Sequence, residues 1–167
     1  MEPDRRNEIL NFVKANPGYY FRELQRSLKL PTGVLQYHLN NLIKDGEIIY
    51  EELNGTKCYF PAKSFSRQQI IILSHLRNHI RNKIMRMLLS GNAMSPSELI
   101  KNLKISAPTL SYHLSLLTQD NVLERVQMEK GIGYRIKDME SMKGLIIEYR
   151  ESFIDKLVQD FIEIWTK

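Results

Sequence analysis

The order of hydrophobic and polar positions between residues 20 and 45 predicts two short helices joined by a tight turn. Pro31 lies between these helices, and we expect it to end the first one because it has no backbone N–H. Polar residues cover one side of the second helix, which suits DNA better than a core. The pattern is that of a helix-turn-helix, whose second helix enters a major groove. Leucines mark the buried side of both helices, at Leu24, Leu28, Leu35, Leu39 and Leu42.

The chain repeats this pattern. A shift of 75 positions aligns the sequence with itself without a gap from about residue 4 to residue 60. Residues 37–39 read Tyr-His-Leu, and residues 112–114 read the same. A repeat of this length is a whole domain, so the sequence predicts two tandem domains of one fold.

Each copy is expected to hold three helices and a β-hairpin. In the first copy, Asn54-Gly55 between two β-prone runs is a strong hairpin signal, and Gly46 is expected to stop the third helix. In the second copy, Ser95 and Glu98 form a capping box, Ser106 caps the third helix, and residues 130–133 form a longer, more flexible wing tip. The predicted helices are 4–15, 20–30, 32–45, 79–90 and 107–120, with a further helix that begins at the capping box of Ser95 and Glu98, and the predicted strands are 48–53, 57–60, 123–129 and 134–137.

The fold class is therefore mainly α with small β-hairpin wings: two tandem winged helix-turn-helix domains and a long C-terminal helix. The predicted domains are 1–62 and 79–137. Between them, residues 63–78 are expected to form a linker helix that fuses with the next helix into one rod. Residues 138–167 are expected to form one amphipathic helix with a wide apolar face, and a dimer is predicted through this face. The predicted dimer contacts are Phe153, Leu157, Phe161 and Trp165.

Composition and charge narrow the function. The chain has 167 residues, of which 43% are hydrophobic and 26% charged, and its net charge is +5. Residues 138–167 hold seven acids and four bases, a net of −3, so the remaining residues carry +8. The positive charge is thus on the repeated domains and the linker, where a phosphate backbone would lie. No apolar signal region or membrane span is found, so a cytoplasmic location is expected. The single cysteine excludes an intramolecular disulfide.

Exposed residues of the two third helices and of the wings are the candidate DNA contacts. Gln36, Asn40 and Asn41 suit the N6/N7 edge of adenine, whereas the second copy offers shorter, less amide-rich side chains. Glu51 and Glu52 weaken the case for the first wing, because carboxylates repel phosphate. The full predicted set is Thr32, Gln36, Tyr37, Asn40, Asn41, Lys44, Lys57, Ser106, Thr109, Ser111, Tyr112, Ser115, Gln119, Arg125, Lys130 and Arg135. For the two tyrosines, packing beside the helix is an equal alternative.

Other candidate chemistry is weaker. His38 and His113 have no partner at metal-ligand spacing, so hydrogen bonding within their own domains is favoured over metal binding. His75 and His79 are four positions apart but have no further ligands nearby. Cys58 has no resolving cysteine for redox sensing. No catalytic motif or cofactor loop is found, so neither an enzyme nor a cofactor is predicted.

The chain resembles archaeal tandem winged-helix transcriptional regulators, which are loosely related to the bacterial ArsR and MarR groups. The resemblance rests on GYYFRELQRSLKLPTGVLQYHLNNL with CYFP in the first copy, and on SPSELIKNLKISAPTLSYHLSLL with GYRI in the second. It implies a DNA-binding regulator of transcription. Regulators of archaellum genes in methanogens have a similar layout. The chain departs from metal-sensing ArsR proteins because it lacks paired cysteines.

Two functions follow from these patterns. The first is a sequence-specific regulator that binds double-stranded promoter DNA as a homodimer, with the basal transcription machinery as a further candidate partner. The second is a winged-helix scaffold that binds a protein or RNA within a transcription or RNA-handling complex. A basic recognition face would favour DNA, whereas basic charge confined to the linker would favour the second function.

Overall fold

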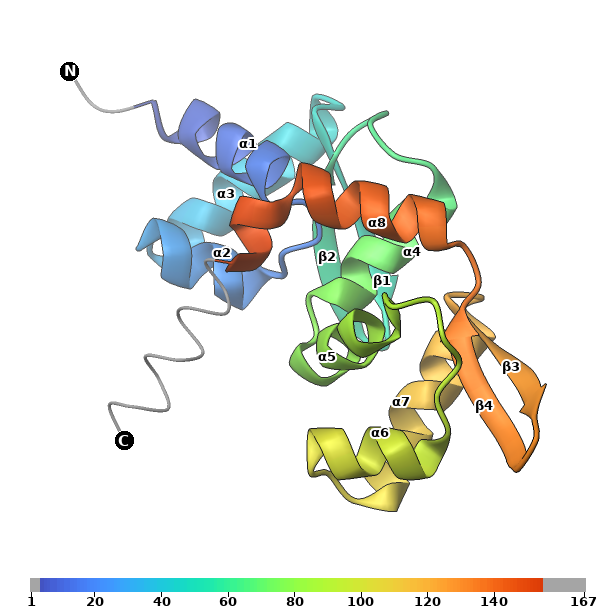
Figure 1. Cartoon of the computed structure of the whole chain (residues 1–167). Coiled ribbons are helices and arrows are strands. Elements are labelled where there is room, and N and C mark those ends of the chain that lie inside the picture. The colour runs from blue at the N-terminus through green and yellow to red at the C-terminus, as the bar shows by residue number, and fades with distance from the viewer. Residues whose placement is uncertain (1–3, 155–167) are drawn as a thin grey trace. The chain divides into compact units, whose positions relative to one another are not determined.

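In the computed structural model the chain is described from residue 4 to residue 154 (Figure 1). The described residues divide into two compact units: unit 1 holds residues 4–74 and 149–154, and unit 2 holds residues 75–148. None of the described helices is long and apolar enough to cross a membrane. The elements in chain order are α1 (Arg5–Ala15), α2 (Phe21–Leu28), α3 (Thr32–Lys44), β1 (Ile48–Leu53), β2 (Thr56–Pro61), α4 (Arg67–Leu76), α5 (His79–Leu88), α6 (Pro96–Leu103), α7 (Ala107–Gln119), β3 (Leu123–Met128), β4 (Gly131–Ile136) and α8 (Met139–Glu148).

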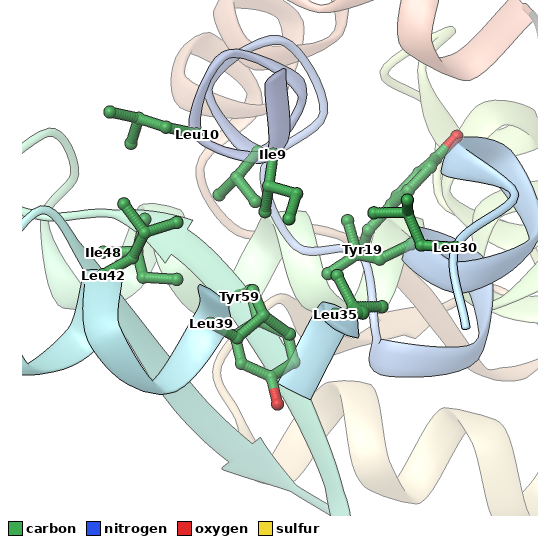
Figure 2. Close-up of a cluster of buried hydrophobic side chains, with 11 residues drawn as sticks. Ile9, Leu10, Tyr19, Leu30, Leu35, Leu39, Leu42, Ile48 and Tyr59 are labelled. Carbon is green, nitrogen blue, oxygen red and sulfur yellow. The ribbon is translucent and has the colours of Figure 1, made fainter. Parts of the chain in front are cut away.

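Unit 1 is built around one hydrophobic core (Figure 2). The inward faces of α1, α2 and α3 meet the start of β1 and the middle of β2, and the leucines that define the helical pattern lie at the centre. Leu24, Leu35, Leu39 and Leu42 are all fully buried. This confirms the predicted inner faces of the two helices of the helix-turn-helix.

Unit 2 buries the same positions. For eight of the core residues of unit 1, the residue 75 places later is again apolar and buried, which confirms that the repeat is a repeat of one fold. The matched pairs are Ile9 and Ile84, Leu10 and Met85, Val13 and Leu88, Leu24 and Leu99, Leu35 and Leu110, Leu39 and Leu114, Leu42 and Leu117, and Ile48 and Leu123.

The turn of each helix-turn-helix is made by a left-handed lysine. Lys29 ends α2 with φ 52° and Lys104 ends α6 with φ 55°. Our expectation that Pro31 ends the first helix is wrong in mechanism, because α2 stops at Leu28 and Pro31 is instead the N-cap of α3. The second unit makes the same turn with Ser106 at the matching position, so the turn does not require a proline there.

Both wings are tight antiparallel hairpins. In the first, Leu53 pairs with Thr56 across Asn54-Gly55, as predicted. In the second, Met128 pairs with Gly131, so the turn contains only two residues and the expected longer tip is wrong. The glycines at 131 and 133 belong to β4 instead. A Cβ atom at Gly133 would overlap the side chain of Met128, which explains why a glycine stands inside this strand.

The second strand of each wing also makes a backbone hydrogen bond with the residue two places before the second helix of its domain. In unit 1 the Tyr59 amide donates to the Tyr19 carbonyl at 3.0 Å. In unit 2 the Tyr134 amide donates to the Met94 carbonyl at 2.9 Å. This contact ties each wing to the start of its own helix-turn-helix, so the wing and the recognition helix are held in one domain.

The segments outside the repeat differ from expectation. The predicted rod is interrupted, because α4 ends at Leu76 and Asn78 caps α5 by accepting hydrogen bonds from the amides of Ile80 and Arg81. The predicted single C-terminal helix is also broken: α8 ends at Glu148, Tyr149 is a turn, and residues 150–154 are helical again.

The residues after this second break belong to unit 1. Ser152 Oγ donates to Asn16 Oδ1 at 2.6 Å, and the Tyr149 ring lies 5.7 Å from the Phe65 ring. Residues 149–154 therefore return to the first domain, a pairing that spans most of the sequence and that local patterns could not predict.

Candidate nucleic-acid interface

The outer face of α3 holds the predicted contacts of the first domain. Thr32, Gln36, Tyr37, Asn40 and Lys44 are exposed, and Asn41 is half-buried. The buried leucines of the same helix hold this face outward. The structure thus brings the predicted α3 residues together on one helix face.

Two side-chain hydrogen bonds order the polar groups of α3. Gln36 Nε2 donates to Asn40 Oδ1 at 2.8 Å, so the two amides lie side by side on the surface. Gln25 Nε2 donates to Thr32 Oγ1 at 2.7 Å and connects α2 to the first residue of α3. Gln25 was not predicted to contact the recognition helix. Its position one helical turn before the end of α2 is the only sequence signal for this hydrogen bond.

The outer face of α7 carries shorter side chains than that of α3, and none of them is charged. Ser111, Tyr112, Ser115 and Gln119 are exposed, and Thr109 is half-buried. Ser106 is the N-cap: its Oγ accepts from the Thr109 amide at 3.3 Å and lies 2.7 Å from the Thr109 hydroxyl. The cap is as predicted, but these contacts leave the Ser106 and Thr109 hydroxyls less available to a ligand.

The repeated tyrosines are the most exposed aromatic side chains of the two recognition helices. Tyr37 is 64% exposed and Tyr112 is 57% exposed. Each ring stands edge-on to the histidine that follows it, with centroids 5.2 Å and 5.1 Å apart. These exposures favour the surface role over packing beside the helix.

The basic residues of the wings differ in whether their charged groups already contact another side chain of the same wing. Lys57 Nζ lies 4.5 Å from the centroid of the Tyr50 ring. Arg135 Nε lies 2.6 Å from Glu124 Oε1 on the paired strand, so its charge is already matched. Arg125 and Lys130 are exposed and are the better candidates in the second wing.

Sequence reasoning missed a basic pair that both domains share. Arg26 and Lys29 of the first domain match Lys101 and Lys104 of the second at the repeat spacing, and all four are exposed. They lie at the end of α2 or α6, beside the turn into the recognition helix. A search for bases kept in register between the copies would have found them.

The linker bases are less available than their number predicts. Arg77 is fully buried, and Arg81 is half-buried and donates to His75. Arg67 forms an ion pair with Glu51, with 2.6 Å between Nη1 and Oε1. Folding therefore engages part of the positive charge between residues 67 and 81.

The histidines have structural surroundings. His113 is buried in unit 2, where burial and the charge of Arg81 lower its pKa. His75 is buried against Asp120 and Arg81. His79 belongs to the next helix, so His75 and His79 do not share one helix face. Cys58 is buried in β2.

The predicted dimer contacts are only partly described. Phe153 is buried, so it is not available to a second chain in this conformation. Leu157, Phe161 and Trp165 lie outside the described residues. Two other apolar residues of the C-terminal region are exposed, Ile147 at 67% and Ile154 at 50%.

Comparison with known proteins agrees with this architecture. Residues 3–70 match the family described as an N-terminal HTH domain, and residues 78–125 match the bacterial regulatory protein, arsR family. An uncharacterized HTH-type transcriptional regulator of Methanocaldococcus jannaschii is 29% identical over 135 residues, which are 81% of this chain. The chain spans about a third of that relative's length (34%).

Two solved bacterial structures align with part of this chain. HlyU from Vibrio cholerae is 26% identical and matches 53% of this chain and 95% of its own, with a TM-score of 0.46. The transcriptional repressor PagR of Bacillus anthracis is 26% identical and matches 47% of this chain and 88% of its own, with a TM-score of 0.42. The two family matches and the archaeal relative confirm the resemblance: this chain is a tandem winged helix-turn-helix protein related to archaeal transcriptional regulators.

Proposed function

We propose that the protein is a sequence-specific regulator of transcription that places α3 and α7 in the major groove of double-stranded DNA. The observation that carries the proposal is repeated in both domains. An exposed, mostly uncharged polar helix face stands beside two exposed bases at the turn that precedes it. Bases at this turn suit phosphate contacts, which position a protein, and the polar helix face suits base edges, which specify sequence.

The paired amides of α3 supply a specific means of reading DNA. Since Gln36 Nε2 donates to Asn40 Oδ1, the groups left to face outward are Gln36 Oε1 and Asn40 Nδ2. One accepts and the other donates, which complements the N6 donor and N7 acceptor of adenine. The two side chains together therefore favour adenine in the first half of the site.

The second domain contributes differently. Hydroxyl groups on α7 make shorter and less selective contacts than amides, and Tyr112 offers an apolar ring to a thymine methyl group. We expect the first domain to carry most of the sequence preference. The second domain then adds affinity through Lys101, Lys104 and its wing.

The engaged linker bases count against a scaffold or RNA-binding role. That role was tied to basic charge confined to the linker, yet Arg77 is buried and Arg67 is paired with Glu51. The exposed bases beside the recognition helices support DNA instead.

We further infer that the protein acts in the cytoplasm as a homodimer on promoter DNA, with the basal transcription machinery as a candidate partner. The exposed Ile147 supports an apolar contact between chains. Replacing it by glutamate should shift sedimentation from dimer toward monomer. A wild-type protein that sediments as a monomer would contradict the dimer and leave DNA binding untouched.

Selection of duplexes from a random pool by the wild-type protein tests the DNA-binding proposal. The selected duplexes should share a motif in which an adenine tolerates no substitution, and an Asn40→Ala variant should lose the preference at that position. Selection of no common motif would contradict a sequence-specific regulator.

A further inference from the structure

His75 lies between two charged groups of unit 2. Its Nε2 atom lies 2.6 Å from Asp120 Oδ2, and its Nδ1 atom lies 3.0 Å from Arg81 Nη1. The imidazole is 1% exposed, whereas the Asp120 side chain is 32% exposed. Asp120 is the C-cap of α7 and Arg81 belongs to α5, so one buried ring joins the end of the recognition helix to the first helix of its domain.

The geometry fixes the protonation state of this ring. A guanidinium group can only donate hydrogen bonds, so Nδ1 must be an acceptor without a proton. A carboxylate can only accept, so Nε2 carries the proton and donates it to Asp120. His75 is therefore neutral, with its proton on Nε2.

The first domain makes the corresponding connection without a histidine. Arg6 and Asp45 stand 75 places before Arg81 and Asp120, and their side chains form a direct ion pair of 2.9 Å on the surface. In the second domain the matching arginine and aspartate both contact a buried imidazole, whereas the matching pair of the first domain is a direct contact on the surface.

We propose that neutral His75 positions the recognition helix α7 by bridging Asp120 and Arg81, and that protonation of His75 weakens the hold of the second domain on DNA. The proposal rests on the proposed function, because it assigns a positioning residue to the same interface. Surface ion pairs contribute little, whereas a buried hydrogen-bonded bridge is costly to break.

The charged and titratable groups around the ring agree with a neutral His75 near pH 7. Arg81 on α5 opposes protonation, Asp120 at the end of α7 favours it, and His113 on α7 opposes it weakly. Burial is the largest influence, and with Arg81 it lowers the pKa of His75 below the usual histidine value. A proton on Nδ1 removes the acceptor for Arg81 and places an N–H against the guanidinium group.

The test compares His75→Phe and His75→Gln with the wild type on a duplex that the wild type selects from a random pool. Phenylalanine keeps the ring and removes both nitrogens, so binding at about pH 7.5 should weaken about fivefold, the equivalent of one net hydrogen bond. Glutamine can place an amide N–H near Asp120 and does not titrate in this range, so it should restore most of the affinity. His79→Gln, at an exposed histidine of α5, is the control and should match the wild type.

The pH profile separates positioning from a general loss of packing. As the pH is lowered from about 7.5, through and below the usual histidine range, to the lowest pH at which both proteins stay folded, the affinity of the wild type relative to His75→Gln should fall up to fivefold. Only the wild type can gain a proton at this position, and its lowered pKa moves that gain to more acidic solution. Charging of other histidines acts on both proteins and cancels in this ratio. A ratio that stays constant with pH would overturn the proposal. If His75→Phe does not fold, this ratio still decides.

A measurement without DNA keeps the two proposals distinguishable. Nitrogen-15 chemical shifts of His75 should show a proton on Nε2 and none on Nδ1 near pH 7. The protection of the amides at the end of α7 against hydrogen exchange, measured relative to the intrinsic rate at each pH, should decrease as the pH falls. A proton on Nδ1 near pH 7 would overturn the bridge. Failure of the wild type to select any duplex would instead contradict the proposed function.

Discussion

Gln36 donates a hydrogen bond from Nε2 to Oδ1 of Asn40 at 2.8 Å, and both side chains are exposed on the outer face of α3. An exposed pair four residues apart on a helix contributes only a few tenths of a kcal/mol, about 0.2–0.5, to helix stability. The pair therefore adds little to the stability of the fold, but it leaves the Gln36 Oε1 and Asn40 Nδ2 atoms for the recognition of adenine that we propose.

Replacing either amide should change specificity more than stability. Asn40→Ala is expected to weaken binding to the selected duplex by about 1–3 kcal/mol and to leave binding to unrelated duplexes unchanged. The double variant with Gln36→Ala should lose less binding free energy than the sum of the losses of the two single variants, because the two side chains act as one hydrogen-bonded unit. Asn11→Ala, at an exposed position of α1, is the matched control. An equal loss on all duplexes would contradict base recognition by this pair.

The bases beside the second helix-turn-helix should act on every sequence alike. The double variant Lys101→Gln, Lys104→Gln is expected to weaken binding to selected and unrelated duplexes equally. It should also reduce the slope of log affinity against log salt by about 2, because each lost phosphate contact removes roughly 0.9. Lys143→Gln, at an exposed lysine of α8, should leave the slope unchanged. An unchanged slope in the double variant would show that these lysines do not contact phosphate.

Two glycines of unit 2 should respond to alanine in opposite directions. At Gly144, in the exposed face of α8, no atom lies within 4 Å of an added Cβ, so Gly144→Ala should stabilise the protein by about 1 kcal/mol through helix propensity. At Gly133 the added Cβ would overlap Met128 and lie 3.3 Å from the Met94 carbonyl oxygen, so Gly133→Ala should cost about 1–3 kcal/mol. Chemical denaturation measures both changes. The same sign at both positions would contradict the packing described for the second wing.

The capping box of α6 predicts a pH dependence of stability. The Ser95 amide and hydroxyl donate to Glu98 Oε2 at 2.7 Å and 2.9 Å, and these bonds lower the pKa of Glu98. The carboxylate therefore stabilises the folded state above the usual glutamate pKa, and this contribution is lost as the pH falls through the folded-state pKa.

Comparison of the wild type with Glu98→Gln isolates this effect. The difference in melting temperature between the two proteins should be largest near neutral pH and should shrink as the solution is acidified. The substituted amide would still accept a hydrogen bond from Ser95 but would not titrate, so a difference that does not vary with pH would show that the charge of Glu98 is irrelevant to the cap.

Local patterns predicted most of the domain fold because each element carries its own signal. Leucine spacing gave the buried faces of α3 and α7, Asn54-Gly55 gave the first hairpin, and Ser95 with Glu98 gave the start of α6. The internal repeat then tested each assignment against its copy. The outward placement of the predicted contacts on α3 follows from the same periodicity.

Features that depend on contacts distant in sequence could not be predicted in this way. The bridge from His75 to Asp120 spans 45 positions, and the bond from Ser152 to Asn16 spans 136. The burial of Arg77 also depends on tertiary packing, which local patterns do not reveal. The second wing tip was predicted too long because its glycines indicated a loop, whereas Gly133 is required inside β4 by the side chain of Met128.

Binding of the wild-type protein to a selected duplex and to an unrelated duplex of the same length, measured across a range of salt concentrations, tests the central claim most directly. A tandem winged-helix regulator of DNA should bind both duplexes with a steep loss of affinity as salt rises, and should prefer the selected duplex by about a thousandfold or more at physiological salt. Affinity that depends on neither salt nor sequence would contradict recognition of DNA by α3 and α7.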